Sequence, residues 1–194
     1  MRIVTIYTVT LFFIYSIIAN AQEKTSYMVP GKISAIRQPS TMACWLAVTT
    51  MMLSWKDGKN YTIDDVAKTI GDPWKLFYEL NTGLPEKDKN SFIKKMGLVG
   101  LPPANHMLEK YIDLLKQNGP LWITTGDEWS SHARVLIGVE GKGRYDDTDF
   151  IFIDPATGEV QRQPVLNFMK DFEEQAYAAN RGKWAEIPIQ IYHF

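Results

Sequence analysis

Residues 38–45 read QPSTMACW, and the character of the chain changes within this stretch. Pro39 and the two residues after it are poor helix formers, whereas from Cys44 to Trp55 apolar side chains recur at steps of three and four residues. The pattern predicts a helix that begins at Cys44 and ends before Gly58. The first residue of this helix is the single cysteine of the chain.

The position of Cys44 at a helix start favours a reactive thiol. The positive end of the helix dipole and the unpaired N–H groups of the first turn both favour the thiolate, which is the nucleophilic form of cysteine. A thiol that attacks a carbonyl creates an oxyanion, and the Gln38 amide in the preceding loop is a candidate donor to it, together with the Cys44 backbone N–H. A packed core cysteine and an ordinary loop glutamine are the alternatives.

Two residues of the second half are candidates for the same site. The chain has three histidines, and His132 opens the strongest strand pattern, which extends to Val139. Asp154 follows the apolar strand at 150–153 and could hydrogen-bond an imidazole on the neighbouring strand, which would fix its tautomer. A satisfied structural histidine is the alternative for His132, and a turn-forming aspartate before Pro155 is the alternative for Asp154.

The period of the apolar residues changes from helical to alternating near residue 119. Before it, an irregular arm is expected over 22–40 and helices over 44–55, 62–70, 74–80, 87–96 and 104–117. After it, strands are expected over 121–123, 132–139, 150–153, 159–163 and 187–192, with a short helix over 165–172. Pro188 places the last strand near an edge of the sheet. The outline is α+β: a helical N-terminal lobe packed on a C-terminal antiparallel β-sheet, with the interlobe cleft as the natural active site.

The N-terminus has the three parts of a secretory signal peptide. Met1-Arg2 is a short positive region, residues 3–18 are nearly all apolar, and Ala19-Asn20-Ala21 supplies small residues for cleavage. Cleavage after Ala21 is expected to leave a secreted or periplasmic protein with one domain over 22–194, divided into a helical lobe at about 22–118 and a sheet lobe at about 119–194. An uncleaved membrane anchor is the alternative, although the apolar run is short for a span.

The composition limits the partners. Hydrophobic residues make up 45% and charged residues 22% of the chain, as in ordinary soluble globular proteins. The formal net charge of −1 implies neither a nucleic-acid partner nor an anionic membrane surface. One cysteine in an exported protein has no partner for a structural disulfide. The cysteine and the dispersed histidines show no metal-ligand spacing, so neither a metal nor a cofactor is expected.

Together these motifs resemble the papain-like cysteine proteases. Gln38 lies six residues before Cys44, and residues 43–45 match the last three positions of the papain signature. The closer resemblance is to short bacterial papain-like proteases of the avirulence-effector type, which carry a Gly-Pro-Leu-Trp strand, a His-Ala-Arg strand and an Ile-Asp-Pro-Ala turn. The corresponding segments here are 119–122, 132–134 and 153–156, and the likeness spans about 37–172.

The resemblance implies a papain-like fold and a reaction. Cys44 would be the nucleophile, His132 the general base and acid, Asp154 the orienting carboxylate and Gln38 the oxyanion donor. Papain itself uses an asparagine as the third member, whereas this chain has Asp154, as the bacterial group does. The implied reaction is hydrolysis of a peptide or isopeptide bond in a protein or peptide substrate, through a thioester intermediate.

Two other interpretations stay open from the sequence. A periplasmic enzyme with the same thiol chemistry could cleave the cross-links or stem peptides of peptidoglycan. A secreted binding or inhibitory protein could keep the scaffold without catalysis. Turnover of purified sacculi would favour the first of these, and the absence of any Cys44-dependent activity would favour the second.

Overall fold

The computed structural model describes residues 25–126, 131–179 and 187–194 of the chain. The expected signal peptide, with its cleavage site after Ala21, lies outside the described residues. Within these residues no helix combines the length and the apolar character needed to cross a membrane.

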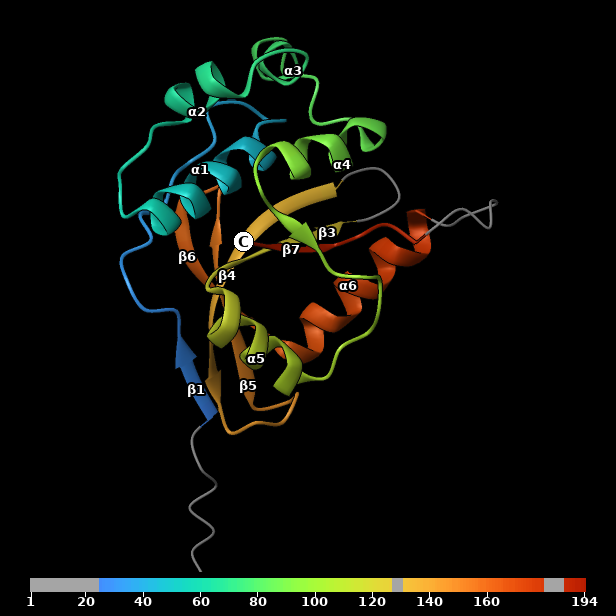
Figure 1. Ribbon diagram of the computed structural model, residues 1–194. Coiled ribbons are helices and arrows are strands. Elements are labelled where there is room, and N and C mark those ends of the chain that lie inside the picture. The colour runs from blue at the N-terminus through green and yellow to red at the C-terminus, as the bar shows by residue number, and fades with distance from the viewer. Residues whose placement is uncertain (1–24, 127–130, 180–186) are drawn as a thin grey trace, which may run out of the picture.

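The helices of the N-terminal half form one group at one end of the molecule (Figure 1). They are α1 (Cys44–Asp57), α2 (Ile63–Ile70), α3 (Trp74–Glu79) and α4 (Glu86–Lys95). Local sequence explains two of their limits. Gly58 takes the left-handed conformation (φ 61°) that ends α1. Thr62 begins α2 with a capping box, in which its hydroxyl accepts from the Asp65 N–H and the Asp65 carboxylate accepts from the Thr62 N–H.

The two later helices differ from the expected ranges. α5 (Leu108–Asn118) begins after the predicted start at 104, because Met107 is still extended (φ −68°, ψ 158°). His106, which lies within the predicted range 104–117, therefore precedes the helix. α6 (Val165–Ala179) continues past the predicted end at 172, because Phe168, Phe172 and Gln175 continue its buried face.

One antiparallel sheet packs against these helices, in the strand order β2-β7-β3-β4-β5-β6 with β1 paired to β4. The strands are β1 (Thr25–Met28), β2 (Val99–Gly100), β3 (Leu121–Gly126), β4 (Ser131–Gly141), β5 (Thr148–Asp154), β6 (Glu159–Pro164) and β7 (Ile191–His193). The α+β prediction is thus confirmed, with helices in the N-terminal half and the antiparallel sheet in the C-terminal half.

One detail predicted for the strands is wrong, and another is confirmed. The arm over 22–40 is not irregular throughout, because Thr25–Met28 pairs with the C-terminal part of β4. The last strand lies near an edge of the sheet, as expected, because β2 is the edge strand and pairs with its outer side. Pro188 precedes β7, where its missing N–H removes no bond from the ladder.

Alternation along the central strands divides the buried side chains between two cores. Phe150 and Phe152 lie in a core with α5 and α6, whereas Ile151 and Ile153 lie in a core with α1, α2 and α4. Helix α1 is almost wholly buried from Trp45 to Met52. Packing on many sides therefore fixes the position of the residue that begins this helix.

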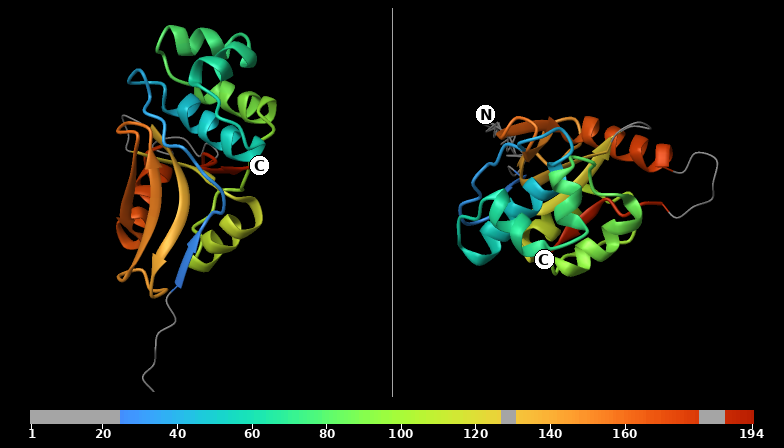
Figure 2. Two further views of the ribbon diagram at one scale, coloured as in Figure 1. Left: turned by 90° about the vertical axis from the view of Figure 1, so that its left-hand side faces the viewer. Right: turned by 90° about the horizontal axis from the view of Figure 1, so that it is seen from above.

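The segment between β1 and α1 runs from the far end of the sheet to the helical group (Figure 2). It meets the sheet again where the Gln38 N–H donates to the Pro155 carbonyl at 2.8 Å. Since β4 and β5 are antiparallel, with Val135 opposite Ile153, the start of β4 and the end of β5 lie at this same end of the sheet. The N-terminus of α1 thereby approaches the strand ends that carry His132 and Asp154.

Candidate active site

Cys44 is the first residue of α1, as the sequence predicted, and its side chain is half-buried. No side chain caps this helix end, and the first-turn N–H groups of a helix have no intrahelical partners. The preceding loop is held by hydrogen bonds from the Ala43 N–H to the Ser40 carbonyl at 3.3 Å and from the Met42 N–H to the Asn81 side chain at 2.9 Å. The thiol thus stands at the positive end of a rigid helix.

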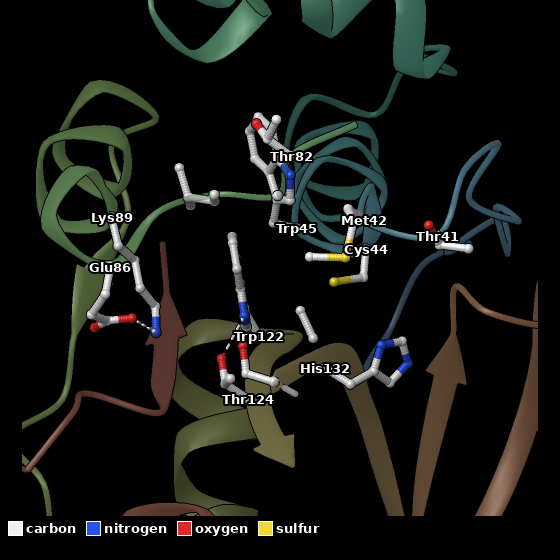
Figure 3. A pocket seen from close by; sticks show the side chains of 14 residues that line it. Thr41, Met42, Cys44, Trp45, Thr82, Glu86, Lys89, Trp122, Thr124 and His132 are labelled. Atoms are coloured by element: carbon white, nitrogen blue, oxygen red, sulfur yellow. Dashed lines mark hydrogen bonds and ion pairs between the residues drawn. The ribbon is translucent and has the colours of Figure 1, made fainter. Parts of the chain in front are cut away.

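His132 and Asp154 are in direct contact across β4 and β5. The His132 Nε2 lies 2.7 Å from the Asp154 Oδ1, and Cys44 also acts on the imidazole, since it contributes to the raised pKa of His132. Because Nε2 faces the carboxylate, Nδ1 is the nitrogen left for the thiol. Figure 3 shows the Cys44 sulfur and the His132 ring beside one another at one side of a pocket. Three of the four residues expected at the site therefore come together.

The charges of this group support one another. Burial by itself would lower the pKa of His132, but hydrogen bonds to Asp154 and Cys44 and the charges of both raise it to about 9. Burial would raise the pKa of Asp154, but hydrogen bonds from His132 and from the Ala156 N–H, with the nearby positive charges, hold it below its ordinary value. The pair is thus an imidazolium and a carboxylate over the neutral pH range.

Gln38 lies in the loop before Cys44 but is turned toward its own backbone. Its Nε2 donates to the carbonyls of Ser40 at 2.7 Å and Thr41 at 2.9 Å, which accounts for both N–H groups of the amide. Its Oε1 is buried and has no partner among the described residues. The structure therefore brings Gln38 near the helix start without directing its amide into the pocket.

The other two histidines lie away from Cys44. His106 packs edge-on against Tyr111, with ring centroids 6.1 Å apart, and burial lowers its pKa. His193 bonds the carbonyl of Phe194 through Nδ1 at 2.9 Å. Among the described residues no cluster of His, Cys, Asp and Glu side chains is suited to hold a metal ion. Of the histidines, only His132 is in contact with both the thiol and a carboxylate.

A pocket of about 130 Å³ opens between the helical group and the sheet beside Cys44 (Figure 3). This volume suits a single substrate side chain and is below that of typical small-molecule sites. Both layers of the molecule line it: Thr41, Met42, Cys44, Trp45, Thr82, Gly83, Leu84, Glu86 and Lys89 from one side, and Trp122, Thr124, Ser131, His132 and Ala133 from the other. The expected interlobe cleft is therefore present.

Lys89 is a pocket residue that the sequence did not indicate. It is only 7% exposed, its Nζ lies 3.5 Å from Glu86 Oε2, and it donates to the Ile189 carbonyl at 3.3 Å. Burial lowers the pKa of Lys89, while Glu86 acts in the opposite direction. Lysines are common on exposed helix faces, so nothing in the sequence around residue 89 distinguishes this one. The pairing with the backbone before β7 arises only in the folded chain.

The arrangement has the parts that nucleophilic catalysis by a thiol requires. A thiol at a helix start, an imidazole within its reach and a carboxylate that orients the imidazole suit acyl transfer at a carbonyl group. The pocket beside the thiol is large enough to seat a side chain of the molecule that carries this carbonyl.

Comparison with known proteins agrees with this chemistry. The model of the family described as papain-like cysteine protease AvrRpt2 matches residues 24–175, which is well over half of the chain. No curated protein shows significant similarity to it. The members of this family are cysteine peptidases, which are hydrolases that act on protein substrates. The chain belongs to the papain-like cysteine proteases of the AvrRpt2 family.

Proposed function

We propose that this peptidase is a secreted enzyme that hydrolyses peptide or isopeptide bonds with Cys44 as nucleophile, His132 as general base and acid, and Asp154 as the orienting carboxylate. The observation that carries the proposal is the imidazole of His132, which bonds the Asp154 carboxylate at 2.7 Å and lies beside the Cys44 thiol. A structural histidine needs one good partner, whereas a catalytic one needs an orienting partner on one nitrogen and a reacting group on the other.

The reaction follows from these positions. The Cys44 thiolate attacks the carbonyl carbon of the scissile bond, and the carbonyl oxygen takes the negative charge. The His132 imidazolium donates its proton to the leaving nitrogen as the C–N bond breaks, which releases an amine and leaves a thioester on Cys44. Neutral His132 then takes a proton from water, the hydroxide attacks the thioester, and the acid product leaves as the thiolate re-forms.

The oxyanion needs two donors in this scheme. The Cys44 backbone N–H is one candidate, because the first residue of α1 has no intrahelical acceptor. The Gln38 amide is the other candidate, and its present acceptors are two carbonyls of its own loop. Gln38 would exchange one of these carbonyls for the oxyanion when substrate enters, since catalytic hydrogen bonds often form fully only in the complex.

Export is proposed from the sequence alone. The positive start, the apolar stretch and the Ala19-Asn20-Ala21 site favour a signal peptide that is cleaved after Ala21. The mature protein would then begin at Gln22 and act in the periplasm or outside the cell. The intact mass of the exported protein measures this directly, and a mass that includes residues 1–21 would contradict secretion as a soluble enzyme.

The decisive experiment compares wild type with Cys44→Ala on two classes of substrate. A peptide library with isopeptide members and a preparation of purified sacculi are incubated with each protein, and the new termini are identified by mass spectrometry. Cleavage of peptides by wild type, and its loss in Cys44→Ala, is the expected outcome. Release of stem peptides from sacculi without cleavage of the library would replace a protein substrate with peptidoglycan. Cleavage that persists in Cys44→Ala would reject Cys44 as the nucleophile.

His106→Ala serves as the matched control in the same experiment. His106 lies outside the pocket against Tyr111, so its removal should leave the cleavage pattern and the rate unchanged.

A further inference from the structure

Arg134 carries a buried positive charge that has no part in the reaction described above. The residue is only 8% exposed, and its guanidinium lies over the ring of Phe152, 4.2 Å from the centroid. Nη2 donates to Gln163 Oε1 at 2.9 Å and to Thr125 Oγ1 at 3.4 Å. Within the described part of the chain, Nε has no partner. Both acceptors are neutral, so neither of them balances the charge.

A buried cation without compensation is costly, and two carboxylates lie near enough to provide it. Burial lowers the pKa of Arg134, and the charges of Asp154 and Asp171 act in the opposite direction. Gln163 connects the guanidinium to the second carboxylate, because its Nε2 donates to the Asp171 Oδ2 at 2.6 Å. Arg134 therefore interacts through its charge with a carboxylate on α6 and with the carboxylate that contacts His132.

The strand register explains why Arg134 and Asp154 are neighbours. Val135 pairs with Ile153, so the next positions, Arg134 and Asp154, stand opposite one another at the end of the ladder. Alternation directs His132 and Arg134, two residues apart, to the same face of β4. The positive charge of Arg134 contributes to the lowered pKa of the Asp154 carboxyl.

Other groups also face Asp154. His132 on β4 and the Ala156 N–H in the following turn donate to it, and Glu159 on β6 stands opposite it in register. The Cys44 thiol lies beside the imidazole. Arg134 adds a permanent positive charge to this group, whereas His132 loses its charge as the pH rises through about 9.

We propose that Arg134 is a positioning residue of the catalytic site, whose fixed positive charge on the neighbouring strand supports the contact between the Asp154 carboxylate and His132. The inference rests on the proposed triad and adds a residue that touches neither substrate nor thiol. Phe152, Thr125 and Gln163 fix the guanidinium, so its charge stays at one place relative to Asp154. Without it, burial would be opposed only by His132 and the Ala156 N–H, so the pKa of Asp154 would be higher and the carboxylate would hold the imidazolium less well as the pH falls.

The test is the pH profile of kcat/KM for wild type, Arg134→Met, Arg134→Lys and Arg162→Met. Arg162 is a matched control, because it is also a strand arginine but pairs with Glu140 at the surface. In Arg134→Met the acid limb should move to higher pH, so that the rate at the acid end falls severalfold relative to the rate at neutrality. The alkaline limb, which follows His132, should stay in place. Arg134→Lys keeps the charge and should restore most of the acid limb.

A merely structural Arg134 gives a different result. Its loss would lower kcat/KM by one factor at every pH, and that outcome, or an equal shift in Arg162→Met, overturns the proposal. If Arg134→Met does not fold, Asp171→Asn tests the same interaction by strengthening it. Asp171 is the second carboxylate whose negative charge acts on Arg134, so its removal leaves more of the positive charge to act on Asp154. The acid limb should then move to lower pH, and a limb that stays or moves upward contradicts the proposal.

A carbon NMR titration of the Asp154 carboxyl separates this inference from the proposed function. The titration of Asp154 should move to higher pH in Arg134→Met, and this readout does not need activity. If the wild type shows no Cys44-dependent cleavage but the titration moves as expected, the proposed function fails while the electrostatic role of Arg134 stands. If cleavage depends on Cys44 but the titration does not move, the role of Arg134 fails alone.

Discussion

Two segments meet at the candidate site, and they are held in different ways. The ends of β4 and β5 are fixed by strand register, and their side chains bond one another, with 2.7 Å between His132 and Asp154. The loop over 38–43 is fixed through its backbone at Pro155 and Asn81, and its Gln38 side chain bonds its own carbonyls. The strand pair is thus already arranged for proton transfer, whereas the loop has its polar amide turned inward.

The segment before Cys44 and the turn after Asp154 are also closely packed against one another. Gly158, in the turn after Asp154, has a φ of 73°, and a Cβ at this position would come within 2.8 Å of the Arg37 Cβ. Only glycine combines this backbone conformation with so close an approach. The chain before Cys44 therefore packs directly against the turn that follows β5 and Asp154. In the proposed mechanism, the general base and the nucleophile are therefore in place before substrate binds, and Gln38 completes the oxyanion site when substrate enters.

The largest expected effect on turnover comes from removing His132, the proposed general base on β4. His132→Ala should lower turnover roughly 10⁴-fold, the upper range for loss of a general acid–base residue. It should also slow the reaction of Cys44 with iodoacetamide at mildly acidic pH by at least about 10-fold, because a nearby opposite charge stabilises the thiolate. The measurement is the alkylation rate against pH, followed by mass spectrometry.

His106→Ala is the control for this measurement and should retain the wild-type alkylation profile. Equal alkylation rates in wild type and His132→Ala at mildly acidic pH would mean that the imidazole does not activate the thiol. The contact between His132 and Asp154 would then be structural only, and its difference from the Gln38 loop would say nothing about catalysis.

The residues that the sequence predicted best are those set by regular structure. Cys44 was located by a helical period that begins after a helix-poor stretch, and His132 and Asp154 by apolar strands that start or end at them. The contact between the latter two follows from antiparallel pairing, which the short connection between their strands favours. The partner of the Gln38 amide could not be predicted, because loop hydrogen bonds depend on φ and ψ angles that a glutamine does not specify.

Other features were missed because their signal is non-local. β1 is a short strand with no clear apolar alternation, and it forms because β4 is long enough to offer it a free edge. Lys89 and Arg134 look like ordinary surface charges in the sequence, and their burial is decided by distant partners such as the Ile189 carbonyl and Phe152.

A smaller effect is expected from the loop. Gln38→Ala should lower turnover by about 10²–10³-fold, the usual loss when one oxyanion donor is removed. Alkylation of Cys44 by iodoacetamide creates no oxyanion, so its rate should stay at the wild-type value. Gln161→Ala, which removes a glutamine bonded to Thr157 away from the pocket, is the matched control.

The two rates together decide what the Gln38 amide does. If turnover and alkylation fall together, its bonds to Ser40 and Thr41 serve to hold Cys44 in place, and the oxyanion role is wrong. If neither falls, Gln38 is an ordinary loop residue, and the remaining donor is the backbone of α1 alone.

The smallest effect is the stability that the strand pair itself contributes, compared between wild type and Asp154→Asn. The folded pKa of His132, about 9, is above its ordinary value of 6.5, so its contribution is full below pH 6.5 and is lost as the pH rises through about 9. The folded pKa of Asp154 is below its ordinary value of 3.8, so its contribution is present above pH 3.8 and is lost as the pH falls through the folded value. Both contributions to stability are therefore complete only between pH 3.8 and pH 6.5.

The expected size of the effect follows from exposure. Since the His132 side chain is 32% exposed, we expect a difference of about 2 kcal/mol in unfolding free energy in this pH window, between the values typical of exposed and of buried pairs. Urea unfolding followed by tryptophan fluorescence at several pH values measures it. A difference that stays constant from mildly acidic pH to beyond pH 9 would mean that the pair is a neutral hydrogen bond and that the imidazolium is not held by Asp154.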